Sequence, residues 1–185
     1  MGDEGYEREA TDDEIAAMRE VVADGMRAGA LGFASSFSAI HRGDRGLPIP
    51  SRNGTREEFV ALASVLGELG YGAVSYAPGV PVTWRDSYEI QPAIGRPLMW
   101  TPMLTTYPEP DYKAMMAEHA AGVAGGADVH PQITCLPLTI QLRMDNPYYF
   151  RTVPIFLELL GYDPSEFERF YRDPAWRAEA ALQAP

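Results

Sequence analysis

The sequence is poor in the residues that most often carry metal, redox or disulfide chemistry. Its 185 residues include one cysteine, Cys135, and three histidines. A single cysteine excludes an internal disulfide, and so few imidazole and thiol groups leave little from which to build a zinc site. The sequence also has no Gly-x-Gly-x-x-Gly motif after a predicted strand, no Walker loop, no Cys-x-x-Cys pair and no EF-hand spacing. The usual signals of nucleotide, structural-zinc and calcium sites are therefore absent.

Basic residues are scarce as well. The chain carries 15 Lys and Arg against 26 Asp and Glu, which gives a formal net charge of −11. Nucleic-acid binding depends on clustered basic side chains, and the nearest approach to a cluster is Arg42 with Arg45, which Asp44 interrupts. We therefore expect no nucleic-acid partner. The acidic residues concentrate in 3–24 and 158–173, where solvated helix faces account for them.

Long hydrophobic runs are missing too. No apolar stretch approaches the roughly 18 to 20 residues of a membrane span, and the first residues, Met-Gly-Asp-Glu, do not form a signal peptide. Together with the lone cysteine, this predicts a cytoplasmic protein with no membrane partner. An apolar content of 46% over 185 residues is enough for one sizeable core. We expect a single domain over 1–185, with a flexible lead at 1–10.

The sequence is rich in alternating helix and strand patterns. Thr11-Asp-Asp-Glu14 and Thr55-Arg-Glu-Glu58 both have the capping-box pattern that begins a helix. The helices that follow have apolar residues at helical spacing and end at Gly29 and Gly70. Short apolar runs bounded by Gly and Pro indicate strands between them. The predicted helices are 12–28, 55–70, 84–94 and 111–123, and the predicted strands are 30–37, 72–77, 97–104 and 129–136.

Strands that alternate with helices predict an α/β fold with parallel pairing and right-handed crossovers. About four strands are present, whereas a closed (β/α)8 barrel has eight and typically about 250 residues. The chain is therefore either a small open α/β domain or part of a TIM-type barrel. The aromatic-rich tail, 147–185, predicts two or three helices broken by Pro154, Pro164 and Pro174.

Candidate ligand contacts follow the first predicted strand. Ser36 ends this strand, and a loop rich in Gly and Pro then runs through His41 to Arg52, a place where α/β proteins bind ligands. His41 suits either contact with substrate or metal, or a surface hydrogen bond to backbone. Arg52 suits either a bidentate clamp on a substrate carboxylate or a salt bridge to an acidic neighbour, Glu57 or Glu58. Ser36 lacks the Gly-x-Ser-x-Gly elbow of a serine nucleophile.

The other histidines and the cysteine are weaker candidates. His130 and Cys135 lie on one predicted strand, but five positions separate them, which places their side chains on opposite faces. They are a poor pair of metal ligands, and Cys135 is expected to be a small buried hydrophobe. His119 lies in the middle of a predicted helix among Ala and Glu and is expected to be exposed.

Several segments, taken in order, form a recognisable series. They are Glu7-Arg-Glu-Ala-Thr-Asp-Asp-Glu14, Gly29-Ala-Leu-Gly-Phe33, His41-Arg-Gly43, Pro48-Ile-Pro-Ser-Arg52, Pro131-Gln-Ile-Thr-Cys-Leu-Pro-Leu138 and Tyr171-Arg-Asp-Pro-Ala-Trp-Arg177. Together they resemble the middle of the amidohydrolase superfamily, and most closely the N-acyl-D-amino-acid deacylases, or D-aminoacylases. The similarity runs over nearly the whole chain.

The resemblance implies a metal-dependent hydrolase on a barrel that splits the amide, or a related C–N bond, of an N-acyl amino acid. In such an enzyme zinc polarises the carbonyl and activates a water, and an aspartate takes the proton. The family's His-x-His pair and its late aspartate lie outside the matched region. The two strand ends that carry histidines in zinc-binding members correspond here to Ala77-Pro78 and Thr101-Pro102.

The resemblance thus implies an internal fragment or truncated product that lacks metal ligands of its own and has little or no activity alone. Its expected substrate-binding residues are Ser36, His41, Arg52 and Thr101, and no residue is assigned as catalytic. The alternative is a non-catalytic binding or self-association module, because the ligands are absent and the chain has ten Tyr and seven Phe. Clustering of the four candidates around one concavity favours the first hypothesis, and scatter favours the second.

Overall fold

The computed structural model describes residues 1–43, 46–104, 111–137, 139–150 and 153–183. They divide into two compact units. One, the sheet unit, comprises Met1–Ser38 and Ile49–Cys135. The other, the helical unit, comprises Ala39–Pro48 and Leu136–Pro185.

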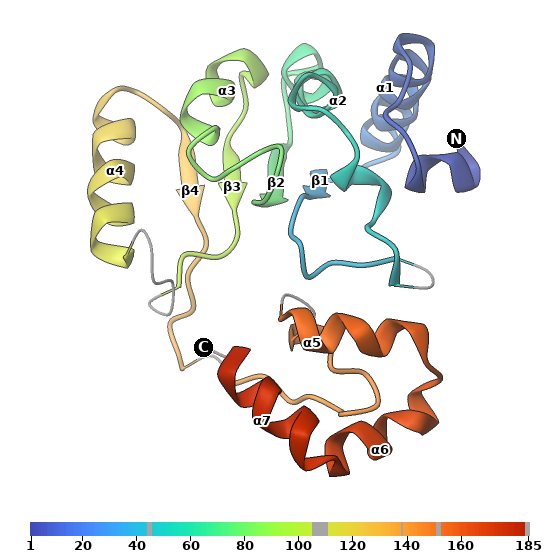
Figure 1. The fold of residues 1–185 in the computed structure, drawn as a ribbon. Helices are drawn as coiled ribbons and strands as arrows, with labels where there is room; N and C mark the ends of the chain where they lie inside the picture. Colours follow the sequence, from blue (N-terminus) through green and yellow to red (C-terminus); the bar gives the residue numbers. More distant parts are fainter. Residues whose placement is uncertain (44–45, 105–110, 138, 151–152, 184–185) are drawn as a thin grey trace. The chain divides into compact units, whose positions relative to one another are not determined.

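Four parallel strands form one sheet in the sheet unit, in the order β1-β2-β3-β4 (Figure 1). This confirms the predicted α/β class with about four parallel strands. The register aligns Ala34 with Ser75, Ser75 with Met99 and Met99 with His130, so these residues form one row across the sheet. The strands are β1 (Gly32–Ser36), β2 (Ala73–Ala77), β3 (Leu98–Trp100) and β4 (Val129–Pro131).

The two later strands are shorter than predicted. The prediction of a strand over 97–104 is wrong beyond Trp100, and that over 129–136 is wrong beyond Pro131. Prolines stand at these ends, and a proline has no amide hydrogen to donate to a strand ladder. Beyond these ends β3 and β4 are joined by isolated backbone hydrogen bonds. Gln132 N donates to the Trp100 carbonyl oxygen at 2.8 Å, and Met103 N donates to the Gln132 carbonyl oxygen at 2.9 Å.

The four predicted helices between the strands are present. They are α1 (Asp12–Arg27), α2 (Arg56–Leu69), α3 (Ser87–Ile94) and α4 (Tyr112–Ala124). The helix α2 ends as predicted at Gly70, whose φ of 79° is the left-handed conformation that glycine adopts without strain. The residues before α1, expected to be a flexible lead, include the 3₁₀ helix η1 (Gly2–Tyr6), and a second 3₁₀ helix, η3 (Pro50–Arg52), precedes α2.

The two predicted capping boxes differ in the structure. At α1 the box is complete, because Thr11 Oγ1 accepts from Glu14 N and the Glu14 carboxylate accepts from Thr11 N. At α2 only half of it forms. Thr55 Oγ1 accepts from Glu58 N at 3.0 Å, but no return bond from Thr55 N to the Glu58 carboxylate is made. The prediction of a full capping box at Thr55–Glu58 is therefore wrong, and this carboxylate lies elsewhere.

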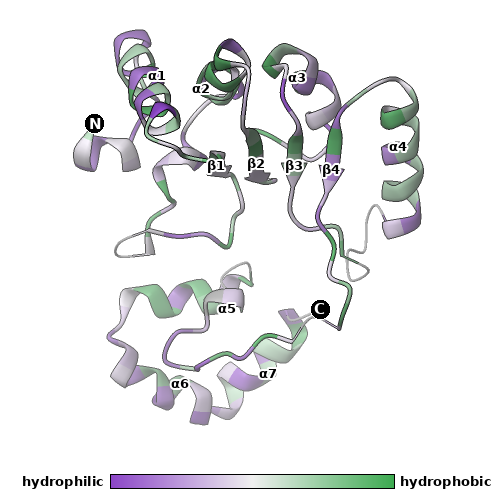
Figure 2. Ribbon diagram, turned by 180° about the vertical axis from the view of Figure 1, so that it is seen from behind, coloured by the Kyte–Doolittle hydropathy of each residue, from purple (hydrophilic) through white to green (hydrophobic). Residues whose placement is uncertain are grey.

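One face of the sheet packs against the helices. Alternate strand residues are buried and join a single apolar cluster with side chains from all four helices, and Figure 2 shows β2 and β3 as hydrophobic. Successive right-handed crossovers that always step in the same direction place every helix on that one face. The cluster includes Met26 of α1, Leu66 of α2, Val74 and Tyr76 of β2, Ile90 and Ile94 of α3, Leu98 and Trp100 of β3, Met115 of α4 and Val129 of β4.

The helical unit consists of short helices with their own core of Val153, Ile155, Phe156, Leu159 and Phe167. Pro154, Pro164 and Pro174 each stand in the first turn of a helix, where the missing amide hydrogen breaks no helical bond, so they separate the helices as predicted. The elements are η4 (Tyr148–Phe150), α5 (Pro154–Leu157), η5 (Glu158–Gly161), η6 (Pro164–Glu166), α6 (Phe167–Arg172) and α7 (Pro174–Gln183). Within the described ranges no helix of the chain has the length and apolarity needed to cross a membrane.

Candidate functional site

Three of the four predicted substrate-binding residues lie in the sheet unit. Ser36 is the last residue of β1, and Thr101 directly follows β3, where its amide donates to the Tyr76 carbonyl oxygen at 3.1 Å. Ala77, at the end of β2, pairs with Ser36 and lies between the two. Because the strands are parallel, Ser36 and Thr101 belong to the same carboxyl end of the sheet.

Arg52 is joined to that end through its own short helix. The Ser51 hydroxyl donates to the Ser36 carbonyl oxygen at 2.6 Å, which ties η3 to the last residue of β1. Arg52 is the final residue of η3 and is half-buried. His41 is an exposed residue of the helical unit, so the structure does not bring all four candidates into one unit.

A cavity of about 490 Å³ lies beside β1 in the sheet unit. This is within the ~300–1,000 Å³ range of small-molecule sites. Ser35 and Ser36 of β1, Ser51 of η3 and Glu58 of α2 are polar residues of its lining. The apolar part of the lining includes Ala10, Met18, Phe33, Pro50 and Leu62.

Glu58 is the acidic residue in this lining that sequence reasoning did not single out. It stands in the first turn of α2 and is half-buried, and burial raises the pKa of its carboxyl above the ordinary value, with a further contribution from the charge of Glu9. Its carboxylate lies against Gly54. A Cβ placed on Gly54 would come within 2.7 Å of Glu58 Oε1. The sequence signal was this glycine immediately before the capping threonine, which leaves space for the carboxylate.

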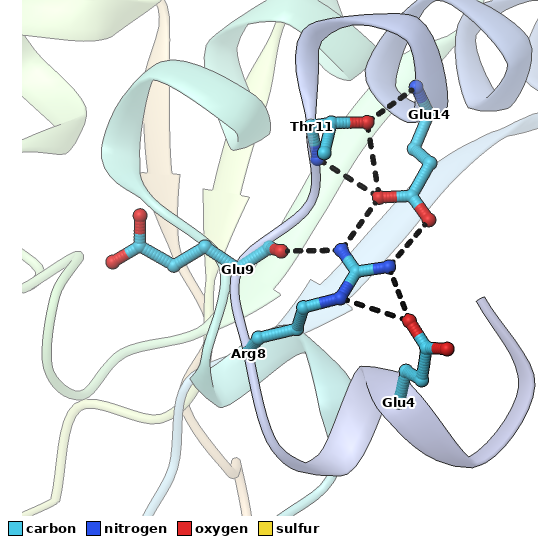
Figure 3. Close-up of polar contacts among 5 residues, drawn as sticks. All are labelled: Glu4, Arg8, Glu9, Thr11 and Glu14. Atoms are coloured by element: carbon cyan, nitrogen blue, oxygen red, sulfur yellow. Dashed lines mark hydrogen bonds and ion pairs between the residues drawn. The ribbon is translucent and has the colours of Figure 1, made fainter.

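The cationic residue of the lining, Arg8, is already neutralised (Figure 3). Its guanidinium donates to Glu4 at 2.6 Å, to Glu14 at 2.8 Å and to the Glu9 carbonyl oxygen at 2.9 Å. The hydrogen bond from Arg8, followed by that from the Thr11 amide, lowers the pKa of Glu14 to about 2. The hydrogen bonds that the structure describes for Arg8 thus go to Glu4, Glu9 and Glu14, and none goes to Glu58.

A second group of polar residues lies around α4. His119 is half-buried, and its Nδ1 is 3.0 Å from the Tyr88 hydroxyl, so the expectation of an exposed His119 is wrong. Burial, and then the neighbouring charge of His130, lower the pKa of His119. His130 Nε2 is 2.7 Å from Asp128 Oδ1 at an exposed position.

Cys135 differs from expectation too. It is exposed, because the chain leaves the sheet after Pro131 and carries Cys135 beyond the strand. The prediction of a small buried cysteine is wrong, and with it the assignment of Cys135 to the opposite face of the same strand as His130.

The residues present do not fit the zinc ion that the family resemblance implies. A zinc site requires several convergent imidazole, thiolate or carboxylate groups. In the part of the chain that the structure describes, no group of three or more His, Cys, Asp or Glu side chains could hold a metal ion. His119 is hydrogen-bonded to the Tyr88 hydroxyl, and His130 is hydrogen-bonded to the Asp128 carboxylate.

Comparisons with protein-family models, with curated proteins and with solved structures found no match to this chain.

Proposed function

We propose that this chain forms four β/α units of a TIM-type (β/α)8 barrel and that the barrel is a hydrolase of the amidohydrolase type. Its substrates are N-acyl amino acids or related compounds with a C–N amide bond. In this proposal the chain binds substrate and does not supply the metal. The support comes from the ordered sequence motifs and from the winding of the sheet.

The strand order is the observation that carries the proposal. Doubly wound sheets reverse their order at a switch point and bear helices on both faces. Here the order β1-β2-β3-β4 has no reversal, and one buried face packs against all four helices. The opposite face carries the row of Ala34, Ser75, Met99 and His130, all half-buried or exposed. In a barrel this row would face the interior.

The carboxyl end of the sheet suits recognition of an N-acyl amino acid. In barrels of this kind the ligand binds at that end. The hydroxyl groups of Ser36 and Thr101 offer hydrogen bonds to an amide, and the guanidinium of Arg52 matches a carboxylate. His41 belongs to the helical unit, and the proposal assigns it no contact at this end of the sheet. Hydrolysis requires groups beyond these, so we expect the isolated chain to be inactive.

The test is binding of N-acetyl-D-methionine to the isotope-labelled chain, followed by NMR. We expect shifts in the amides of residues 34–38, 50–54 and 99–103, and their loss in Arg52→Gln. Arg27→Gln is the matched control, because Arg27 is an exposed arginine at the end of α1 that pairs with Asp24 at 2.9 Å. Metal content after dialysis and release of free amine are measured on the same sample and are expected to be nil. No shifts at millimolar ligand, or equal loss in both variants, would overturn the proposal.

A self-association module is the second candidate, and α4 favours it. This helix contains five alanines, two methionines and one valine, yet Met115 is its buried residue, while Met116 is 55% exposed and Val123 is 46% exposed. Apolar side chains exposed along a helix are typical of a face that another surface covers. The edge strands β1 and β4 add backbone groups for pairing. Sedimentation velocity distinguishes the candidates, because Met116→Asp would dissociate a dimer formed through α4, whereas it would leave ligand binding at the strand ends unchanged.

A further inference from the structure

We propose that the cavity beside β1 is a binding site for a small organic cation, a primary ammonium group on a short apolar body, with Glu58 as the anchoring carboxylate. This site is separate from the carboxylate-recognising role proposed for Arg52 and does not rest on the hydrolase proposal. The cavity has a mostly apolar wall with a few polar groups, which is the usual make-up of a small-molecule site.

The position of the Glu58 carboxylate gives the charge of the ligand. In the complete capping box at α1, the equivalent residue, Glu14, accepts from Thr11 N and from Arg8. Glu58 does neither at α2. In the described ranges its carboxylate has no hydrogen bond or ion pair, and it lies over Gly54 in the cavity wall. A half-buried carboxylate without a partner is stabilised most by a cation that donates hydrogen bonds to it.

The other polar groups of the wall agree with an ammonium ion. Ser35 and Ser51 carry hydroxyl oxygens that accept hydrogen bonds, although the Ser51 hydroxyl donates its own hydrogen to the Ser36 carbonyl oxygen. The Ser36 side chain alternates with that of Ser35 and therefore lies on the other face of β1. The guanidinium of Arg8 is occupied by Glu4 and Glu14, so it does not compete for Glu58 and does not offer a site for an anion.

The apolar wall sets the rest of the ligand. Met18 of α1, Phe33 of β1 and Leu62 of α2 lie in the lining beside Ala10 and Pro50. An unbranched alkyl chain or a small ring buries against such side chains without a further polar group. We therefore use n-hexylammonium as the probe, with 1-hexanol as its neutral analogue and hexanoate as its anionic analogue.

The test is titration of the full chain with the three probes, followed by NMR of the amides of residues 33–36, 54 and 58. We expect saturable shifts with hexylammonium, affinity at least about tenfold lower with hexanol, and no binding of hexanoate, because a hydrogen-bonded charge pair contributes at least this factor. Equal affinity for hexanol and hexylammonium, or no shift with any probe, would overturn the proposal.

Two variants locate the anchor, and one serves as control. Glu58→Gln keeps the side-chain shape and the hydrogen bond from the backbone amide to Thr55 Oγ1 but removes the charge, and it should weaken hexylammonium binding at least about tenfold. Gly54→Ala brings a Cβ to 2.7 Å from Glu58 Oε1 and should displace the carboxylate with a similar loss. Glu57→Gln removes an exposed charge from the same helical turn and should have no effect.

The variants also separate this site from the proposed hydrolase site. If Glu58→Gln and Glu57→Gln bind hexylammonium equally, Glu58 is not the anchor and the proposal fails. If hexylammonium binding depends on Glu58 while N-acetyl-D-methionine does not bind, the hydrolase proposal fails and this one stands. Should Glu58→Gln not fold, intermolecular NOEs between hexylammonium and the Phe33 and Leu62 side chains of the unaltered chain decide the question.

Discussion

A glycine in α2 makes a sharp test of the packing between helices. Substituting alanine for glycine inside a helix ordinarily stabilises it by ~1 kcal/mol. Gly67 should do the opposite, because a Cβ at this position would lie 2.2 Å from the carbonyl oxygen of Ile94, the last residue of α3. The oxygen is a backbone atom and the position of a Cβ is set by the backbone, so α2 and α3 must move apart. We expect Gly67→Ala to destabilise the sheet unit by about 1–3 kcal/mol, as overpacking of a core does.

The chain offers its own control. Gly25 lies in α1, and a Cβ there would meet nothing within 4 Å, so Gly25→Ala should stabilise by ~1 kcal/mol. Unfolding in urea is followed by tryptophan fluorescence in a Trp176→Phe background, because Trp84 and Trp100 then report on the sheet unit alone. Gly67→Ala with unchanged or increased stability would refute the close approach of the two helices, as would equal effects in both variants.

Three further predictions concern single side chains. The pKa of Glu58 is raised in the folded chain, so ionisation of this carboxyl lowers the stability of the fold as pH rises through that pKa. Glu58→Gln removes this loss and should raise the free energy of unfolding at pH 7 more than at pH 4, which urea titrations at the two pH values measure. Arg8→Gln should remove stability that is present above the unfolded pKa of Glu14 and is lost as pH falls toward about 2, so its cost in acid unfolding should shrink at low pH and in high salt. Tyr76→Phe should cost about 1–3 kcal/mol in thermal unfolding, because the buried hydroxyl bonds the Thr83 carbonyl oxygen at 2.7 Å and Ser87 Oγ at 2.9 Å.

Most helices and strands could be predicted because the sequence patterns that specify them are local. Periodic apolar residues, the Thr11 capping box and Gly70 predicted α1 and α2 to within about two residues, as the structure shows. The ends of β3 and β4 were harder to predict, because an apolar run does not show where the backbone amide groups stop donating to the neighbouring strand. Pro102 and Pro131 marked those ends, but only the pairing partner determines how much of the run joins the sheet.

The candidate site was less predictable, because its residues meet across the sequence. Ser36 and Thr101 could be placed at strand ends from the parallel topology alone. The pairing of His119 with Tyr88 joins residues 31 positions apart, and nothing local to His119 predicts it. Glu58 was not predicted as a site residue, because the capping-box pattern already explains a glutamate at that position. Only the structure shows that this carboxylate does not return to the cap.

The barrel and cation-site proposals place competing demands on β1. It is an edge strand of the sheet, and a barrel closes only if a further strand pairs with that edge. Ala34 and Ser36 of β1 also line the cavity, so an added strand would run past the residues that the cation contacts. Occupation of the cavity should then oppose pairing at β1, and the two events should be linked through one free energy. If the chain associates through this edge, saturating hexylammonium should weaken the association in sedimentation velocity, and Glu58→Gln should abolish that effect. Association that is indifferent to hexylammonium would mean that the free edge of β1 and the cavity are independent surfaces.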